Sequence, residues 1–270
     1  MAVVLEGGCR VSEMREGASM VEGALRIWNR IGRATGAQAI SLRVMEFAPG
    51  LSPGIRNDEC DEILYVLEGD WAASRSDHDE VSTTRVSGWV KAFIDGHEHD
   101  VSADTGIYLR PGETLAINNS GPDPILLVSS QCPDPAREPE FVEALTSPVS
   151  DSRVPPPLIR LADRPAQPTA DRWYRVLVNE EIGSTQVTQF VGSIPPGRAP
   201  DHFHNYEEVL FILKGEGRMW AGETNTPVAP GSCIYLPKGQ VHCVENTGSD
   251  ELRLLGVFYP AGSPSVRYDV

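Results

Sequence analysis

The chain contains one series of short segments twice, and this internal repeat limits its fold more than any other feature of its 270 residues. Self-similarity at a fixed spacing indicates copies of one structural unit placed in tandem. Three matches carry the repeat: Gly36 and Gly50 with Gly183 and Gly197 (offset 147), 62–69 (EILYVLEG) with 208–215 (EVLFILKG) (offset 146), and 108–121 (YLRPGETLAINNSG) with 235–248 (YLPKGQVHCVENTG) (offset 127).

Each copy is predicted to consist of short strands. The chain holds 22 prolines and 25 glycines, which favours many turns over long helices. The fall in offset from 146 to 127 places 19 additional residues between Gly69 and Tyr108, which we interpret as a lengthened hairpin. This hairpin is expected to contact the other domain or a second subunit, as in a homodimer, unless its apolar residues are buried in their own domain. The apolar residues concerned are Trp89, Val90 and Phe93.

The second copy carries a group of residues typical of a metal site. His202 and His204 stand two residues apart, so on a strand their imidazoles point to the same face. Glu208 follows in the same phase, and His242 must come from a neighbouring strand. Three imidazoles and one carboxylate suit a divalent transition metal and leave coordination positions open. The strand-forming residues after Glu208 exclude a helical zinc motif, whose ligands are spaced i, i+4.

These two stretches, 197–215 and 231–246, resemble the two signature motifs of the cupin superfamily. Pro237 and Gly239, which shape the turn before His242, also fit those motifs. The resemblance, together with the repeat, implies an all-β protein of two tandem jelly-roll barrels joined by a proline-rich linker, a bicupin. We expect an N-terminal barrel at 20–131, a linker at 132–168 that holds nine of the prolines, and a metal-binding C-terminal barrel at 169–270. Within the linker, Glu140 to Leu145 could form one short helix.

The first copy is predicted to have lost the metal. Alignment on Glu62 and Gly112 places Arg56, Asp58 and Leu115 where the second copy has its histidines. A guanidinium cannot bind a cation and leucine has no lone pair. Arg56 either replaces the charge of the metal by pairing with Glu62 or lies in a disordered rim. The cofactor expected is therefore one divalent transition metal per chain, Fe2+ or Mn2+ first, with Ni2+, Cu2+ and Zn2+ as alternatives.

Two further groups of residues bear on this site. His97 and His99 repeat the His-x-His spacing, but no glutamate follows at the matching distance, so we interpret them as part of an exposed polar turn. Within the second barrel, alternation from Glu208 places Leu210 and Ile212 below the ion. The candidate substrate contacts are Phe190, Leu210, Ile212, Arg218, Trp220 and Tyr235.

Charge and composition exclude several kinds of partner. The formal net charge is −15, so the field of the protein repels nucleic acid and anionic membrane surfaces. The five cysteines are scattered and odd in number, which favours reduced thiols and a cytoplasmic protein. The first twenty residues are too polar for a signal peptide, and no apolar run is long enough to span a bilayer.

The resemblance implies three classes of function, since cupins serve all three. The first is a metal-dependent oxidoreductase, of dioxygenase or oxidase type, in which Glu208 and His242 act at the metal and a small oxygen-rich substrate meets dioxygen. The second is a non-redox isomerase, lyase or decarboxylase that uses the ion as a Lewis acid. The third is a small-molecule binding or sensor protein without turnover.

Overall fold

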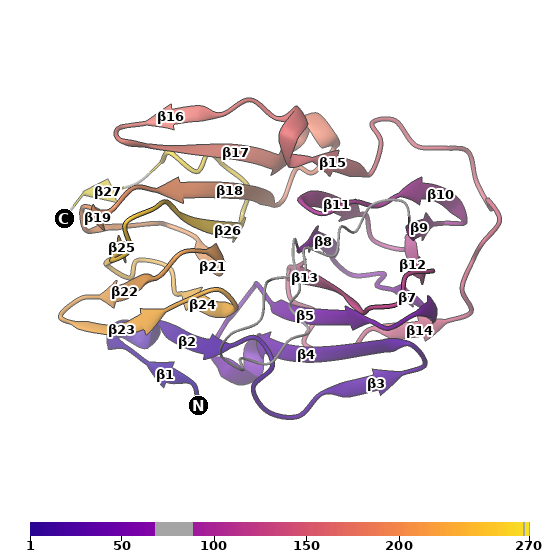
Figure 1. Cartoon of the computed structure of the whole chain (residues 1–270), viewed down its shortest axis with the longest axis horizontal. Coiled ribbons are helices and arrows are strands. Elements are labelled where there is room, and N and C mark those ends of the chain that lie inside the picture. The colour runs from indigo at the N-terminus through magenta and orange to yellow at the C-terminus, as the bar shows by residue number, and fades with distance from the viewer. Residues whose placement is uncertain (68–88, 267, 270) are drawn as a thin grey trace.

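Two β-barrels lie side by side in the computed structural model, which describes residues 1–67, 89–266 and 268–269 (Figure 1). The described residues form strands and short 3-10 helices, η1 (Glu6–Gly8), η2 (Arg33–Thr35), η3 (Leu161–Asp163) and η4 (Glu180–Ile182). The predicted all-β class and the two tandem jelly-roll barrels are therefore confirmed. No helix among the described residues has the length and apolar character needed to cross a membrane.

The first barrel consists of two sheets with an apolar core between them. Its larger sheet has the order β15 (Leu158–Arg160), β11 (Thr105–Leu109), β8 (Asp61–Val66), β13 (Ile125–Cys132), β5 (Leu42–Phe47), β4 (Leu25–Ile31), β3 (Met20–Glu22). Its smaller sheet has the order β10 (His97–Asp100), β9 (Val90–Ile94), β12 (Thr114–Asn119), β7 (Gly54–Arg56), β14 (Glu140–Val142), with β6 (Gly50–Leu51) also paired to β12.

The second barrel has the same plan. Its larger sheet has the order β1 (Val3–Val4), β2 (Arg10–Glu13), β24 (Ser232–Leu236), β21 (Glu207–Lys214), β26 (Leu252–Tyr259), β18 (Thr188–Ile194), β17 (Arg172–Val178), β16 (Gln167–Thr169). Its smaller sheet has the order β23 (Thr224–Val228), β22 (Gly217–Ala221), β25 (His242–Asn246), β20 (His202–Phe203), β27 (Tyr268–Asp269), with β19 (Gly197–Arg198) also paired to β25.

The segment before each barrel adds a strand to the other barrel. β2, near the N-terminus, pairs with β24 of the second barrel, with Val11 opposite Ile234. β15, which precedes the second barrel, pairs with β11 of the first, with Leu158 opposite Ile107. Val11 and Leu158 are 147 residues apart, the same offset that relates Gly36 to Gly183 and Gly50 to Gly197. The internal repeat therefore includes the two crossing strands β2 and β15. The sequence left residues 1–20 unassigned, yet Leu5, Cys9 and Val11 are buried in the second barrel's core.

The expected helix at Glu140 to Leu145 is wrong. Those residues begin with β14, which pairs antiparallel with β7. The apolar Phe141 packs against the first barrel's core, and the pairing supplies the backbone hydrogen bonds that a single helical turn would have left unmade. The linker is therefore fastened to the first barrel along part of its length.

The barrels share a third apolar core that contains residues of both. At its edge, two polar contacts repeat with the internal symmetry of the chain. Glu207 accepts hydrogen bonds from the Tyr235 hydroxyl and from the backbone N–H of Ala39 at 2.6 Å. Its counterpart Asp61 accepts from the Tyr108 hydroxyl at 3.0 Å and from Gln186. Each barrel thus binds a loop of the other through the same acid–tyrosine pair.

The lengthened hairpin predicted between Gly69 and Tyr108 falls largely on 68–88, outside the described residues. Of its three apolar candidates, Val90 and Phe93 lie in β9 and are buried, with exposed fractions of 2% and 8%. Trp89 is 57% exposed. The five cysteines are all buried and free.

Candidate metal centre

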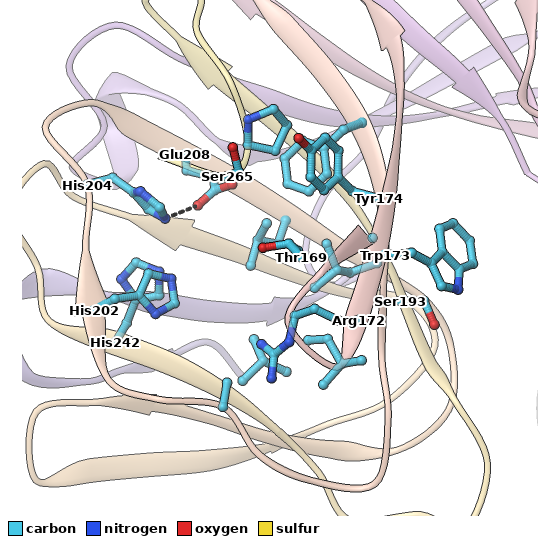
Figure 2. Close-up of a pocket in the computed structure, with 18 residues that line it drawn as sticks. Thr169, Arg172, Trp173, Tyr174, Ser193, His202, His204, Glu208, His242 and Ser265 are labelled. Carbon is cyan, nitrogen blue, oxygen red and sulfur yellow. Dashed lines mark ion pairs between the residues drawn. The ribbon is translucent and has the colours of Figure 1, made fainter. Parts of the chain in front are cut away.

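Three histidines of the second barrel come together across two neighbouring strands (Figure 2). His202 on β20 lies directly opposite His242 on β25 in the antiparallel register. His204 follows two residues after His202, and one nitrogen from each ring lies within 4.8 Å of the others. His204 and His242 are 7% and 4% exposed. Among the described residues, this is the group of His, Cys, Asp or Glu side chains whose spacing could hold a metal ion.

A backbone carbonyl fixes the orientation of each ring. The Nδ1 atoms lie 2.9 Å from Pro200 O for His202, 3.0 Å from Val266 O for His204 and 2.8 Å from Gln240 O for His242. A carbonyl oxygen can only accept, so each Nδ1 carries the proton and donates it. The lone pair of each neutral ring is then on Nε2, the arrangement in which hydrogen bonds to the other ring nitrogen orient metal-binding histidines.

Glu208 lies on β21 beside the triad but outside its closest group. Its Oε2 is 3.7 Å from His204 Nε2, the contact marked by a dashed line in Figure 2. Burial raises the pKa of Glu208 to about 8 and lowers the pKa of His204 to about 4 and that of His242 to about 3. Without metal at neutral pH, the carboxyl is therefore protonated and the imidazole neutral, and the short distance is not a charged pair. A divalent ion would reverse this for Glu208, because it favours the ionised carboxylate.

A cavity of about 130 Å³ opens in front of the triad. Its walls are largely apolar, and Phe190 and Leu210 line it as the sequence suggested. Ile212 does not line it, because it lies further along β21 in the closed core of the barrel. The other apolar residues around the cavity include Ile194, Ala199, Val244 and Leu254.

Three proposed substrate contacts lie elsewhere. On β22, Met219 and Ala221 face the core, so alternation turns Arg218 and Trp220 outward. The Arg218 Nε donates to Asn225 at 2.6 Å and the Trp220 indole donates to Glu245 at 2.8 Å. Tyr235 belongs to the core between the barrels, where its hydroxyl binds Glu207. None of the three lines the cavity.

Sequence reasoning missed other residues around the site. Tyr206 stacks on the His204 ring at 4.7 Å and on Phe258 at 4.3 Å, and so supports one face of that imidazole. Ser265 lines the cavity near the C-terminus of the chain. Arg172 lines it from β17, and the repeat alone could have revealed this residue, because its counterpart at offset 147 is the apolar Leu25.

The first barrel has no imidazole at the matching positions, and Leu115 stands where His242 does, as predicted, but the residues at the other two positions differ from those predicted. Leu115 lies opposite Ile55, as His242 lies opposite His202. The Asn57 carbonyl accepts from Gly112, as the His204 carbonyl accepts from Gly239. Ile55, Asn57 and Leu115 therefore replace the histidines. The interval before Glu62 is one residue longer than that before Glu208, and a shift of one residue reverses the face of a strand.

The predicted pairing of Arg56 with Glu62 is wrong for the same reason. Arg56 points outward and pairs with Asp58 at 2.7 Å, and the two side chains are 43% and 51% exposed. Glu62 instead pairs with Arg43, and both side chains are almost fully buried. The counterpart of Arg43 at offset 147 is Phe190, so a buried ion pair stands where the second barrel has an apolar cavity wall.

His97 and His99 lie on β10, opposite Ile94 and Ala92 of β9. His97 contacts the Ser150 carbonyl at 2.8 Å and the Ser152 hydroxyl at 3.2 Å. Neither histidine belongs to the metal-competent group found among the described residues. They are not the exposed turn that the sequence predicted, because both are half-buried residues of a strand whose exposed face carries Glu98 and Asp100.

Comparison with known proteins places this site in a family. The family described as Cupin domain (Cupin_2) matches residues 190–258, which include the whole triad. Auxin-binding protein 1 of Arabidopsis thaliana is 32% identical over 83 residues, which cover 27% of this chain and 42% of that protein. The oxalate-binding protein of Thermotoga maritima is 35% identical over 66 residues, which cover 24% of this chain and 54% of that protein. The chain thus matches about half the length of these curated relatives.

The fold of the whole chain is similar to that of a solved two-barrel protein. A deletion variant of Bacillus subtilis oxalate decarboxylase OxdC superposes with a TM-score of 0.71 over 93% of this chain and 76% of that chain, at 14% identity. At this identity the likeness concerns the fold. Residues 190–258, with the histidine triad, therefore belong to the Cupin domain family, and the chain as a whole has the fold of that solved protein.

Proposed function

We propose that the second barrel binds one divalent transition metal through His202, His204 and His242, with Glu208 as the fourth ligand, and that it is a metal-dependent enzyme acting on a small oxygen-rich organic molecule. The observation that carries the proposal is the set of three Nδ1–H to carbonyl hydrogen bonds. Histidines that share no ligand would not be expected to hold all three rings with Nδ1 on a carbonyl and Nε2 available to a common ion. The donor set suits Fe2+ or Mn2+, with Ni2+, Cu2+ and Zn2+ as alternatives.

Different residues of the site would orient the imidazoles, exclude water and release a proton. The three carbonyls hold the imidazoles in position, and Tyr206 keeps the His204 ring from rotating. Phe190 and Leu210 exclude bulk water around the reacting groups. Glu208 holds a proton in the metal-free site, where burial places the pKa of its carboxyl at about 8, and it would release that proton on binding the ion. A bound ion would supply a positive centre for a chelating oxygen and, with iron or manganese, access to redox chemistry.

Oxygen-dependent oxidation is the first candidate reaction. Three imidazoles and one carboxylate leave positions for both substrate and dioxygen on an ion that prefers six ligands, and no cysteine belongs to the set, unlike many closed structural zinc sites. The test is to load the protein anaerobically with Fe2+ or Mn2+ and measure oxygen consumption with 1,3-dicarbonyls, catechols, flavonols and 2-oxo acids. Turnover that consumes oxygen in proportion to substrate supports this reaction.

A decarboxylase or other non-redox lyase is the second candidate, and the fold similarity to oxalate decarboxylase favours it. The same assay separates the two, because a lyase forms product without consuming oxygen in proportion to substrate. A metal-loaded protein that binds members of the panel without converting any of them would instead support a binding protein, the kind of function that the names of the auxin-binding and oxalate-binding relatives describe.

A further inference from the structure

One guanidinium faces the cavity of the second barrel. Arg172 is the first residue of β17, and Figure 2 shows its side chain extending from that strand into the space beside His202 and His242. Among the described residues that line the cavity, it is the one arginine or lysine. Charged side chains are rare on the inner face of a small barrel unless a partner compensates them.

The repeat shows that the matching position of the first barrel is apolar. Leu25 and Ile27 of β4 are each 1% exposed and belong to the first barrel's core. Their counterparts at offset 147 are Arg172 and Tyr174, which line the cavity. The arginine thus stands at an inward-facing position in the barrel with the histidine triad, and a leucine stands there in the barrel without it.

The guanidinium retains most of its hydrogen-bonding capacity. Its Nε donates to Asp171 Oδ1 at 3.1 Å, and the Asp171 side chain is 65% exposed while that of Arg172 is 17% exposed. Water screens such a pair strongly. Within the described part of the chain, the two terminal nitrogens of Arg172 have no hydrogen-bond partner, and these are the atoms that bind a carboxylate in a bidentate manner.

The charges within the cavity favour an anion. A divalent ion would contribute +2 and ionised Glu208 −1, and Arg172 adds +1 that the exposed, water-screened Asp171 outside the cavity only partly offsets, so the cavity would be net positive inside a protein whose formal charge is −15. The two positive centres are separate features of the cavity, and the wall around them is formed largely by Phe190, Leu210 and other apolar side chains. A ligand that matches all three features has two oxygen-bearing groups joined by hydrocarbon.

We propose that Arg172 is the specificity-determining residue of this site, and that the substrate is a small organic acid whose oxygens bind the metal at one end and whose separate carboxylate binds Arg172. The inference rests on the proposed metal site and adds the class of substrate. The apolar wall contacts the carbon chain between the two polar ends. A molecule with the same chelating group and no second carboxylate leaves the guanidinium unpaired in a mostly apolar cavity, and so binds more weakly.

The test uses two ligands that differ in that carboxylate alone. Full-length protein is loaded with Co2+, its metal content is measured, and 2-oxoglutarate and 2-oxopentanoate are titrated by calorimetry and by the visible absorption of the metal. We expect 2-oxoglutarate to bind at least about tenfold more tightly, as one charge-assisted pair provides. Arg172→Leu, which copies Leu25, should abolish this preference and keep the metal. Arg172→Lys should keep part of it.

Arg218→Leu is the matched control, because Arg218 lies on the outer face of the same barrel, and it should leave the preference unchanged. Equal binding of the two acids by the wild-type protein, binding of neither, or a preference that survives Arg172→Leu would overturn the proposal. Failure of the metal site itself would appear separately, as a protein that retains no metal before any ligand is added.

Discussion

The carbonyls of Pro200, Val266 and Gln240 decide what the histidine triad can do, because each fixes one ring with Nε2 toward the site. The spacing of the histidines predicted that they meet, since residues two apart on a strand share a face. It could not predict the carbonyl of Val266, which comes from the C-terminal segment 62 residues later in the chain. Contacts between distant segments leave no local pattern in a sequence.

Metal stoichiometry tests the triad directly. Elemental analysis should find one transition metal per chain, because the first barrel has Ile55, Asn57 and Leu115 in place of the histidines. His202→Ala should remove most of this metal. His97→Ala is the control and should remove none, since His97 contacts the backbone of Ser150 in a hairpin. Two tightly bound ions per chain would contradict the assignment.

Proton release on metal binding tests the role of Glu208. At pH 7 the metal-free carboxyl, with a pKa of about 8, is mostly protonated, and a carboxylate ligand must be ionised. His204 and His242, with pKa values of about 4 and 3, are already neutral and release nothing. Glu208 should therefore contribute close to one released proton at pH 7 and less as the pH rises above about 8. Calorimetry in buffers of different ionisation enthalpy measures this number.

Glu208→Gln should bind metal more weakly and release about one proton fewer than the wild-type protein at pH 7. The same release in this variant and in the wild-type protein would show that the proton comes from another group.

At the scale of the strand, registers decide which side chains face the interior. The alignment on Glu62 predicted Arg56 in the first barrel's pocket, but the pairing of β7 with β12 places Ile55 there. One additional residue between β7 and Glu62 is enough to turn Arg56 outward. The motif predicted the positions in the second copy, where nearly every signature residue is present and only Gly197 stands one residue nearer to His202 than the usual pattern has it. In the first copy, too few signature residues remain to indicate the shift.

Arg43 tests the interior of the first barrel. It connects β5 to Glu62 of β8 and, at 3.2 Å, to Ser129 of β13. Removing one partner of a buried ion pair leaves the other charge uncompensated, so Arg43→Ala should lower the free energy of unfolding by about 3–5 kcal/mol. Arg56→Ala, which removes an exposed pair with Asp58, should lower it by about 0–1 kcal/mol. Urea unfolding followed by circular dichroism gives both values, and equal losses would contradict the assignment of Arg43 to the core.

At the scale of the whole molecule, the barrels are joined by a common core and by two matching polar contacts. The core includes Trp28 and Tyr65 of the first barrel with Val209 and Phe211 of the second, and the contacts centre on Asp61 and Glu207. The repeat predicted two similar units, but not that each larger sheet carries apolar side chains on its outer face and that these pack against each other.

This shared core predicts that the barrels unfold together. A ligand that binds only the folded state stabilises everything that unfolds with its site. Adding the metal should therefore slow hydrogen exchange in the first barrel's central strands β8 and β13 as well as in β21 and β26. Mass spectrometry of peptides from both barrels provides the measurement. Protection confined to the second barrel would show that the two unfold independently.

The crossing strands β2 and β15 suggest how such a chain arose. Each copy gives its leading strand to the other, at equivalent places related by the same offset as the matching glycines. Two identical ancestors that exchanged these strands as a pair, and whose genes were later joined end to end, would leave this arrangement. On this view the present molecule is a former homodimer in which one member kept the histidines and the other became free to lose them. A single half separated from the other would then lack one strand of its larger sheet, because β2 is paired to the second barrel and β15 to the first.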